Sequence, residues 1–553
     1  MPQLARRGCT LAMLLLAATL VPTHYAIETT RASTASYDEL VALFQEWRAF
    51  EKPRLVDGVP DYSAAAMAAQ RAELATFRRR LEAIETGGWP VAQRIDYQLV
   101  MAEMSGLDFD HRVRRPWARN PAFYTMIFPG QSDVPAHEGP VAHGWIDLWT
   151  YDYPLDLESA AELASRLRTI PPMLEQARGN LVEDARDLWT MGIRSMEGQS
   201  ADLTALASRV AGTSAELDRA IASARDATDE FRAWLEREAP SKTGPSGIGI
   251  DHYTWYAQHV HLVPYSWEEQ VTIMRRELAR AHSTLRLEEH KNRTLPPMTR
   301  VQTAEEYDRR FNAAVTEYMT FLEQEEIVSV RDYMDAALRA RIGQFRPAEG
   351  LRGFFDEVDY REPVTMRTHG YHWIELARMV EEPHASDIRR VPSLFNIFDA
   401  RSEGLATGME EMMMHAGLFE GKPRARELVY ILLAQRAARA LGGLMMHANE
   451  YTIEQAAQFA SRWTPHGWMP PDSDTVWGEQ HLYLQQPGYG TSYIIGKIEI
   501  EKLLAERALE LGDGFTLKDF LDEFTASGVI PVSLIRWELT GRDDEIRQMT
   551  AAR

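Results

Sequence analysis

A mainly α-helical fold is what the sequence predicts, and three features indicate it. Apolar residues recur at helical spacing among charged ones, N-cap residues precede several of these stretches, and 553 residues can bury a large core. No internal repeat of about 20 to 50 residues is visible, so a solenoid is not expected. We expect residues 27–553 to form one large helical domain of two lobes around a deep cleft, with a few short strands.

The first 26 residues have the layout of a secretory signal peptide. Arg6 and Arg7 precede an uncharged apolar run from Cys9 to Val21, and small residues follow near Ala26. Cys9 is the only cysteine, so the remaining chain has no disulfide and no thiolate metal ligand. The sequence therefore predicts an exported protein of a bacterial periplasm, by either the general or the twin-arginine route.

The charge balance restricts the partners. The chain has 60 Lys and Arg against 81 Asp and Glu, and removing the leader takes away two further positive charges. Such a surface repels phosphate backbones, so we expect no nucleic-acid partner. We expect no membrane span after cleavage of the leader, and a small molecule or short peptide as substrate.

Helices are predicted in order along the chain. Amphipathic stretches cover residues 63–85 and 214–239. Asp156, Ser266 and Thr303 each precede a further amphipathic stretch and have the side chains of N-cap residues.

Three segments depart from this pattern. Residues 239–265 run from a Pro/Gly/Ser loop into aromatic and histidine residues, among which Tyr253, Trp255 and Tyr256 are candidates for lining a substrate pocket. Residues 351–370 are rich in Phe, Tyr and Val and are expected to hold short strands. Residues 463–490 are expected to form a long loop.

The stretch "VTMRTHGYHWIEL", residues 364–376, places His369 and His372 three positions apart. It is not the H-E-x-x-H pattern of zinc hydrolases, because Gly370 follows His369 and no glutamate lies between the histidines. Glu375 lies a further turn away, so a local three-ligand site is geometrically poor. Taken alone, the two histidines are more typical of hydrogen-bonded structural residues than of metal ligands.

Two glutamates give a stronger signal. Glu403 and Glu410, seven positions apart in "ARSEGLATGMEEMMMHAGL", share one face of a predicted helix with apolar neighbours. A buried carboxylate needs a partner, a metal or a proton, and salt bridges to arginines are the alternative to a functional role. The methionines of this stretch are typical of core. In "QQPGYGTSYIIGKIEIEKLL", Tyr489 and Tyr493 stand at a helix start, where a tyrosine either stabilises an oxyanion or packs the helix end.

Several segments, taken together and in order, resemble a bacterial family known as domain of unknown function 885. They are "RIDYQLVMAEMSGLDFDHRVRRPWARNPAFY", "GIGIDHYTWYAQHVHLVPYSWEE", "EGLATGMEEMMMHAGLFE", "HANEYTIEQAA" and "PGYGTSYIIGKIEI". That family looks related to helical zinc metallopeptidases of the carboxypeptidase Taq type. The resemblance therefore implies a metallopeptidase-like fold with a cleft.

The resemblance also implies a damaged metal motif. Typical members carry H-E-x-x-P-G-H-H, and aligning its glycine with Gly370 retains the last histidine as His372. It places Thr365 at the expected first histidine and Met366 at the expected general base. Methionine cannot take a proton from water and threonine is a poor zinc ligand, so we expect no resident metal. If zinc is present, His372 and Glu403 are the expected ligands.

The resemblance also matches single residues of this sequence to positions of the family's other motifs. Glu403 and Glu410 match the acidic positions of the family's "EGWAxYxE" helix, and Tyr493 matches its helix-start tyrosine. His447 matches a common position in an "LHA" segment and, with Tyr489, is expected to contact substrate.

Three functions remain open at this point. The first is an enzyme that performs metal-independent acid/base chemistry, as a lyase, an isomerase or an altered hydrolase, with His369, His372, Glu403, Glu410 and Tyr493 as catalytic residues. The second is a non-catalytic periplasmic binding or scaffold protein that retains a buried polar network. The third is a metal-dependent peptidase or amidase with a replacement zinc site. Fold alone does not decide among them.

Overall fold

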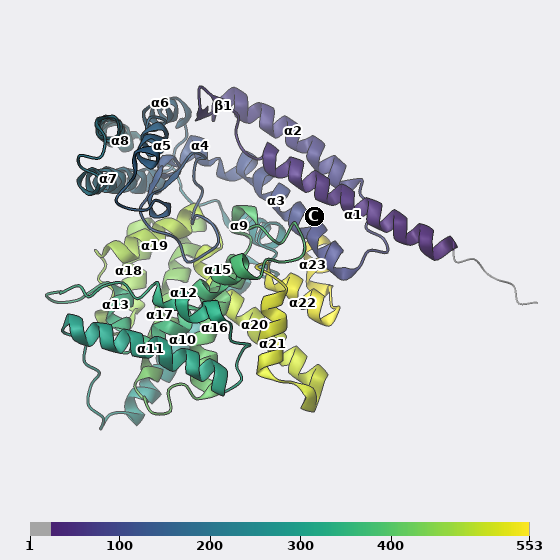
Figure 1. Cartoon of the computed structure of the whole chain (residues 1–553), viewed down its shortest axis with the longest axis vertical. Helices are drawn as coiled ribbons and strands as arrows, with labels where there is room; N and C mark the ends of the chain where they lie inside the picture. The colour runs from purple at the N-terminus through teal and green to yellow at the C-terminus, as the bar shows by residue number, and fades with distance from the viewer. Residues whose placement is uncertain (1–23, 552–553) are drawn as a thin grey trace, which may run out of the picture.

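The computed structural model describes residues 24–551, and most of these residues are in helices (Figure 1). The predicted mainly α-helical class is therefore confirmed. Residues 1–23 of the predicted leader lie outside the described residues.

The N-terminal part of the chain combines helices with two small sheets. Its helices are α1 (His24–Phe50), α2 (Ala64–Glu82), α3 (Val91–Phe109), η1 (Asp110–Arg114), α4 (Pro116–Arg119), η2 (Pro121–Tyr124), η3 (Leu148–Thr150), α5 (Leu157–Leu167), α6 (Ile170–Asn180), α7 (Arg186–Arg209), α8 (Ala215–Glu238) and η4 (Ala239–Ser241). Strands β1 (Leu55–Val56) and β2 (Val59–Pro60) are antiparallel, whereas β3 (Ile127–Phe128) and β4 (Ile146–Asp147) are parallel. The segment that joins β3 to β4 is called the 129–145 loop below.

The β1–β2 hairpin shows how local sequence sets a turn. Asp57 and Gly58 join the two strands, and both have positive φ, 51° and 82°. A two-residue hairpin turn with positive φ at both positions favours Asp-Gly, which is the pair found here.

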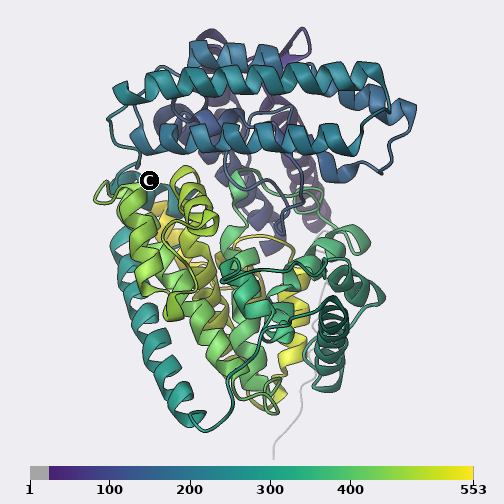
Figure 2. The same cartoon turned by 90° about the vertical axis from the view of Figure 1, so that its left-hand side faces the viewer.

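The C-terminal part, residues 250–551, contains helices and connecting loops and no strand. Its elements are α9 (Ile250–His259), α10 (Trp267–Lys291), α11 (Ala304–Gln324), α12 (Asp332–Arg339), α13 (Phe354–Asp359), α14 (Pro363–His369), α15 (Tyr371–Glu381), η5 (Leu394–Asn396), α16 (Asp399–Ala416), α17 (Ala425–His447), α18 (Ile453–Trp463), η6 (Pro465–Gly467), α19 (Asp474–Gln485), α20 (Tyr489–Leu511), η7 (Gly512–Gly514), α21 (Leu517–Ala526), α22 (Val532–Thr540) and α23 (Asp544–Ala551). Figure 2 shows α7 and α8 lying across one end of the molecule, beside these helices.

The predicted helix starts are confirmed. Asp156 caps α5 by accepting a hydrogen bond from the Ser159 amide, at 2.7 Å. Ser266 forms a capping box with Glu269 at the start of α10, and Thr303 caps α11. These side chains satisfy amide groups that the first helical turn leaves without partners.

Two expectations about irregular segments were wrong. Residues 351–370 contain α13 and α14 instead of strands: Phe354 and Val358 bury their side chains four positions apart on α13, and Val364 is buried on α14. The expected long loop at 463–490 contains η6 and the twelve-residue helix α19, which contacts both α17 and α18.

Helices α16 and α20 approach each other very closely, and this contact positions the site. A Cβ atom on Gly496 would lie 1.6 Å from the Ala400 carbonyl oxygen, and one on Gly404 would lie 2.4 Å from the Gly496 carbonyl carbon. Only glycine allows two helix backbones to come this close. The contact brings Glu403 on α16 next to the first turn of α20.

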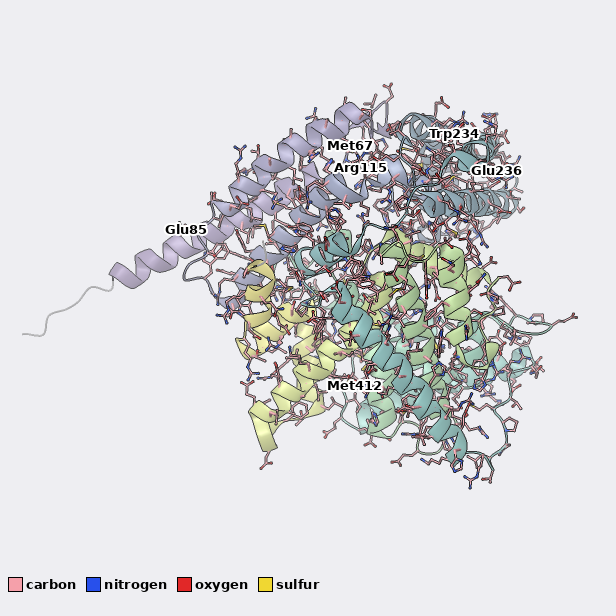
Figure 3. The ribbon with its side chains drawn as sticks, turned by 180° about the vertical axis from the view of Figure 1, so that it is seen from behind. Met67, Glu85, Arg115, Trp234, Glu236 and Met412 are labelled. Atoms are coloured by element: carbon pink, nitrogen blue, oxygen red, sulfur yellow. The ribbon has the colours of Figure 1, made fainter. Side chains whose placement is uncertain are left out.

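Helix α17 is the core helix of this part of the molecule. Among the described residues it alone is long and apolar enough to cross a membrane, and its apolar window is entirely buried by the surrounding protein. The methionines of α16 also belong to the core: Met409, Met413 and Met414 are buried, and Met412 is partly buried. Figure 3 shows Met412 well away from Trp234 of α8 at the other end of the molecule.

Candidate active site

Five helices, α14, α15, α16, α17 and α20, and the 129–145 loop bring ionisable side chains together. Helix α14 ends at His369, Gly370 separates it from α15, and His372 lies in the first turn of α15. Glu403 and Glu410 are both buried on α16, as their shared helix face predicted. Because α14 ends before α15 begins, the two histidines do not share one continuous helix.

His369 is held by a carboxylate and a guanidinium. Its Nδ1 lies 3.1 Å from Glu410 Oε1 and 3.2 Å from Arg436 Nη2. Arg436, fully buried on α17, donates to both oxygens of Glu410 at 2.7 Å. Burial and the neighbouring Arg436 charge lower the pKa of His369. His369 is therefore neutral at pH 7, and Glu410 orients its ring.

His372 is held in the opposite protonation state. Its Nε2 donates to Glu403 Oε2 at 3.0 Å. Burial opposes the charge, but the carboxylates of Glu403 and Asp133 outweigh it and raise the pKa of His372 to about 9. For Glu403, burial is likewise outweighed by the His372 charge and hydrogen bond, which lower its pKa to about 2. The two imidazole ring centroids are only 5.1 Å apart.

A series of hydrogen bonds continues from Glu403 to the 129–145 loop. The Tyr489 hydroxyl donates to Glu403 Oε1 at 2.5 Å and also lies in short contact with Glu138. The Ser132 hydroxyl donates to the other Glu138 oxygen at 3.1 Å. Tyr489 has one proton to donate, so its two carboxylate contacts require a proton on one of the acids. Glu138 is that acid, because burial and the nearby Asp133 charge raise its pKa to about 7.

Tyr493 lies beside this series. Its ring centroid is 5.8 Å from that of Tyr489, and the Cζ atoms of Arg436 and Arg439 are 5.6 Å and 4.6 Å from it. Burial and the Glu403 charge raise the pKa of Tyr493 well above 10, so its phenol stays protonated and can donate a hydrogen bond.

The other expected substrate residues have their contacts outside this cluster. Trp255 stacks on Phe109, and the Tyr256 ring also contacts Phe109. The Tyr253 ring lies 5.2 Å from that of His447, whose Nε2 donates to the Tyr483 carbonyl oxygen at 2.9 Å. Of the expected substrate-binding residues, the structure brings only Tyr489 to the cluster of ionisable groups.

A cavity of about 460 Å³ lies beside the cluster, and the 129–145 loop forms the wall between them. Ser132 and Gln486 line the cavity, whereas Tyr253, Trp255, Tyr256 and His447 do not. Pro135 and Leu376 line both this cavity and a much smaller space at His372. Pro135 and Leu376 therefore lie between the cavity and the space at His372.

The residues present fit zinc only in a new arrangement. Thr365 stands where the resemblance places the first histidine, and its buried hydroxyl has no hydrogen-bond partner among the described residues. Ligand atoms of Asp133, His369 and His372, however, all lie within 4.8 Å of one another, as do those of Asp133, Glu138 and Glu403. Glu375 lies outside both groups and pairs with Arg401 and Arg378.

Sequence reasoning missed four of the charged residues of the cluster. Arg436 and Arg439 interrupt the apolar run of α17, and a charge in such a run was a signal that could have found them. Asp133 and Glu138 lie in an irregular loop with no periodic pattern, so no local signal marked them.

Comparison with known proteins agrees with the sequence resemblance. The family described as "Bacterial protein of unknown function (DUF885)" matches residues 50–366 and 372–539, and the break between the two matched parts falls at the segment that carries His369 and Gly370. No curated protein matches the chain.

Two solved structures share the fold. One is a "putative lipoprotein of unknown function" from Shewanella oneidensis, with 17% identity, a TM-score of 0.64, and coverage of 92% of this chain and 99% of the other. The second is a "putative lipoprotein" from Colwellia psychrerythraea, with 15% identity, a TM-score of 0.59, and coverage of 95% and 99%. The match over most of its length shows that this chain belongs to the DUF885 family of bacterial proteins.

Proposed function

We propose that this protein is an exported enzyme that uses paired imidazoles for acid/base chemistry without a metal. One observation carries the proposal: His369 and His372 lie 5.1 Å apart between their ring centroids, and burial with the Arg436 charge keeps His369 neutral while Glu403 holds His372 protonated. Environments that push the pKa values of neighbouring groups apart are typical of acid/base pairs in active sites. The predicted leader supports export.

His369 serves as the general base. We assign the ring proton to Nδ1, which lies 3.1 Å from Glu410 Oε1 and 3.2 Å from Arg436 Nη2, so that Nε2 is the basic nitrogen; the residue lines a small cavity of about 160 Å³. Arg436 keeps Glu410 ionised, so Glu410 holds the ring in this tautomer, as carboxylates do for catalytic histidines.

His372 serves as the general acid. Glu403 stabilises its charge before the reaction, and the Tyr489–Glu138–Ser132 series offers a route by which protons reach Glu403 from the larger cavity. The pKa of Glu138, about 7, suits a group that gains and loses a proton near neutral pH. The reaction class is therefore proton transfer at a small substrate, as in a lyase, an isomerase or an altered hydrolase.

Deuterium exchange tests this proposal before the physiological substrate is identified. The protein is incubated in D2O and chelator with a panel of small aromatic carboxylic acids and dipeptides, and mass spectrometry follows deuterium uptake at carbon. We expect uptake that His369→Asn and Glu403→Gln abolish. Glu450→Gln, which changes an exposed glutamate, is the control and should leave it unchanged. Uptake that survives in His369→Asn would contradict the assignment of the base.

A metal-dependent hydrolase is the second candidate, and the convergence of Asp133, His369 and His372 favours it. These three residues would hold a divalent cation such as zinc, which supplies Lewis-acid activation of a carbonyl or of water when bound. Glu138 and Glu403 would then accept protons beside it.

Metal content separates the two candidates. The protein is purified without chelator and without a histidine tag, and elemental mass spectrometry is applied to it and to Asp133→Asn and His372→Ala. The first candidate predicts far less than one metal ion per chain in all three. Near-stoichiometric zinc that both variants lose would establish the second.

A further inference from the structure

Aromatic rings from several elements line the larger cavity. Six aromatic side chains belong to its wall: Tyr62, Trp117, Phe123, Trp145, Trp149 and Phe395. Five prolines and several aliphatic side chains lie among them. At about 460 Å³ the cavity falls within the range of about 300 to 1,000 Å³ that is usual for small-molecule sites, whose walls are mostly apolar with a few polar groups. Its size and its wall are therefore those of a binding site.

The charged side chains that line this cavity already have partners in the protein. Arg114 donates to both oxygens of Asp110, at 2.5 Å and 3.0 Å. Arg48 donates at 2.7 Å to Glu103, which is buried and does not line the cavity. The two remaining carboxylates of the wall each face an imidazole. A charged ligand would lose its hydration here without gaining an unpaired partner, so the wall favours an uncharged ligand.

Two histidines of the 129–145 loop supply hydrogen-bonding groups to this wall. His137 Nε2 lies 3.0 Å from Asp147 Oδ1, and His143 Nε2 lies 3.2 Å from Glu51 Oε1. The Trp145 ring adjoins both imidazoles, with centroids 4.9 Å from that of His137 and 5.6 Å from that of His143. Neither Nδ1 has a hydrogen-bond partner among the described residues. A carboxylate beside Nε2 fixes the proton there, so each Nδ1 accepts a hydrogen bond when the ring is neutral.

We infer that the larger cavity binds an uncharged aromatic compound that carries a hydroxyl group. The ring of the ligand packs against the aromatic side chains of the wall in stacked or edge-to-face contacts. The hydroxyl donates to Nδ1 of His137 or His143. The inference goes beyond the proposed function, because neither His369 nor His372 lines this cavity and binding does not require them.

Isothermal titration calorimetry of the full chain with 2-naphthol tests the inference. We expect binding of 2-naphthol, and at least about fivefold weaker binding of decahydro-2-naphthol, which keeps the hydroxyl but has no aromatic system. Sodium 2-naphthoate and naphthalen-2-ylmethylammonium chloride carry opposite charges, and each should bind at least about tenfold more weakly than 2-naphthol. No binding of 2-naphthol, equal binding of the saturated alcohol, or preference for either charged compound would overturn the inference.

Trp149→Ala is the first variant, because Trp149 lines the cavity and is 42% exposed, so its loss leaves the buried core intact. It should weaken binding of 2-naphthol about fivefold, through the loss of an aromatic contact. Trp463→Ala is the matched control, since Trp463 is 40% exposed on α18 and does not line the cavity. This control should bind 2-naphthol as the wild-type protein does.

His137→Phe and His143→Phe each keep a ring and remove the Nδ1 acceptor. At least one of them should weaken binding of 2-naphthol about tenfold, through the loss of the hydrogen bond from the hydroxyl. Wild-type affinity in Trp149→Ala, or in both histidine variants, would overturn the inference. His369→Asn should retain binding of 2-naphthol, and loss of binding in that variant would place the ligand at the two imidazoles and refute the separate site.

Discussion

Glu138→Gln should remove a specific part of the pH dependence of folding. The residue is partly exposed, but its carboxyl group is enclosed by Ser132 and Tyr489, and its pKa rises from the usual 4.5 to about 7. A folded state that holds a proton more tightly than the unfolded state loses stability as pH rises. The loss begins near pH 4.5 and is complete above pH 7. At about 1.4 kcal/mol per pKa unit it amounts to at most about 3 kcal/mol.

Glutamine resembles the protonated acid, because its amide donates to Tyr489 and its carbonyl oxygen accepts from Ser132. The variant should therefore match the wild-type protein at pH 5 and exceed it at pH 8, by up to about 3 kcal/mol. For a chain of this length that corresponds to about 3 °C in Tm. Calorimetry at both pH values measures the effect, and Glu450→Gln on the surface serves as the control. An unchanged difference between pH 5 and pH 8 in Glu138→Gln would refute the assignment of the proton to Glu138.

Three further predictions concern packing and charge. Gly496→Ala should destabilise the fold by more than about 4 kcal/mol, because its Cβ would overlap the backbone of α16; the matched helical change Gly478→Ala, which meets no atom within 4 Å, should stabilise by up to about 1 kcal/mol in the same denaturant titration. Arg389→Met should cost about 3 to 5 kcal/mol in unfolding experiments, because the buried Arg389 side chain donates to Asp96 at 2.7 Å and that carboxylate would lose its cationic partner, keeping only the Tyr37 and Ser386 hydroxyls. The stability contributed by His372 is complete below pH 6.5 and should be lost as pH rises through 9; Glu403→Gln should abolish this alkaline loss.

The helical architecture was predictable because its signals are local. Asp156, Ser266 and Thr303 cap their helices through side chains that contact amides three residues away. The prediction of short strands in residues 351–370 was wrong because short apolar runs fit a strand and a buried helix equally well. Packing among α11, α13 and α14 decides between them, and that information lies outside the segment.

The site was predictable in part. Glu403 and Glu410 stood out because glutamates on an apolar helix face need partners. In the structure each carboxylate pairs with a histidine, and Glu410 also pairs with an arginine. The different protonation of His369 and His372 was not predictable, since it depends on the Arg436 charge beside His369 and on the Glu403 and Asp133 charges near His372, which only the fold brings together.

The contribution of the 129–145 loop could not be predicted from local sequence. Glu138 meets Tyr489 across 351 positions of sequence, and the loop has no periodicity from which its direction could be read. Its role follows from the β3–β4 pair, which fixes both ends of the loop. Long-range placement of an irregular segment is set by tertiary contacts, so the structure was needed to find Asp133 and Glu138.

The protonation states of the two imidazoles test the central claim most directly. Protein labelled with 15N at histidine is examined by NMR at pH 7.5, and His369→Asn and His372→Asn assign the two sets of signals. The account predicts a doubly protonated ring for His372 and a neutral ring with its proton on Nδ1 for His369. Two neutral rings whose signals shift on adding chelator would contradict it and would identify the pair as metal ligands.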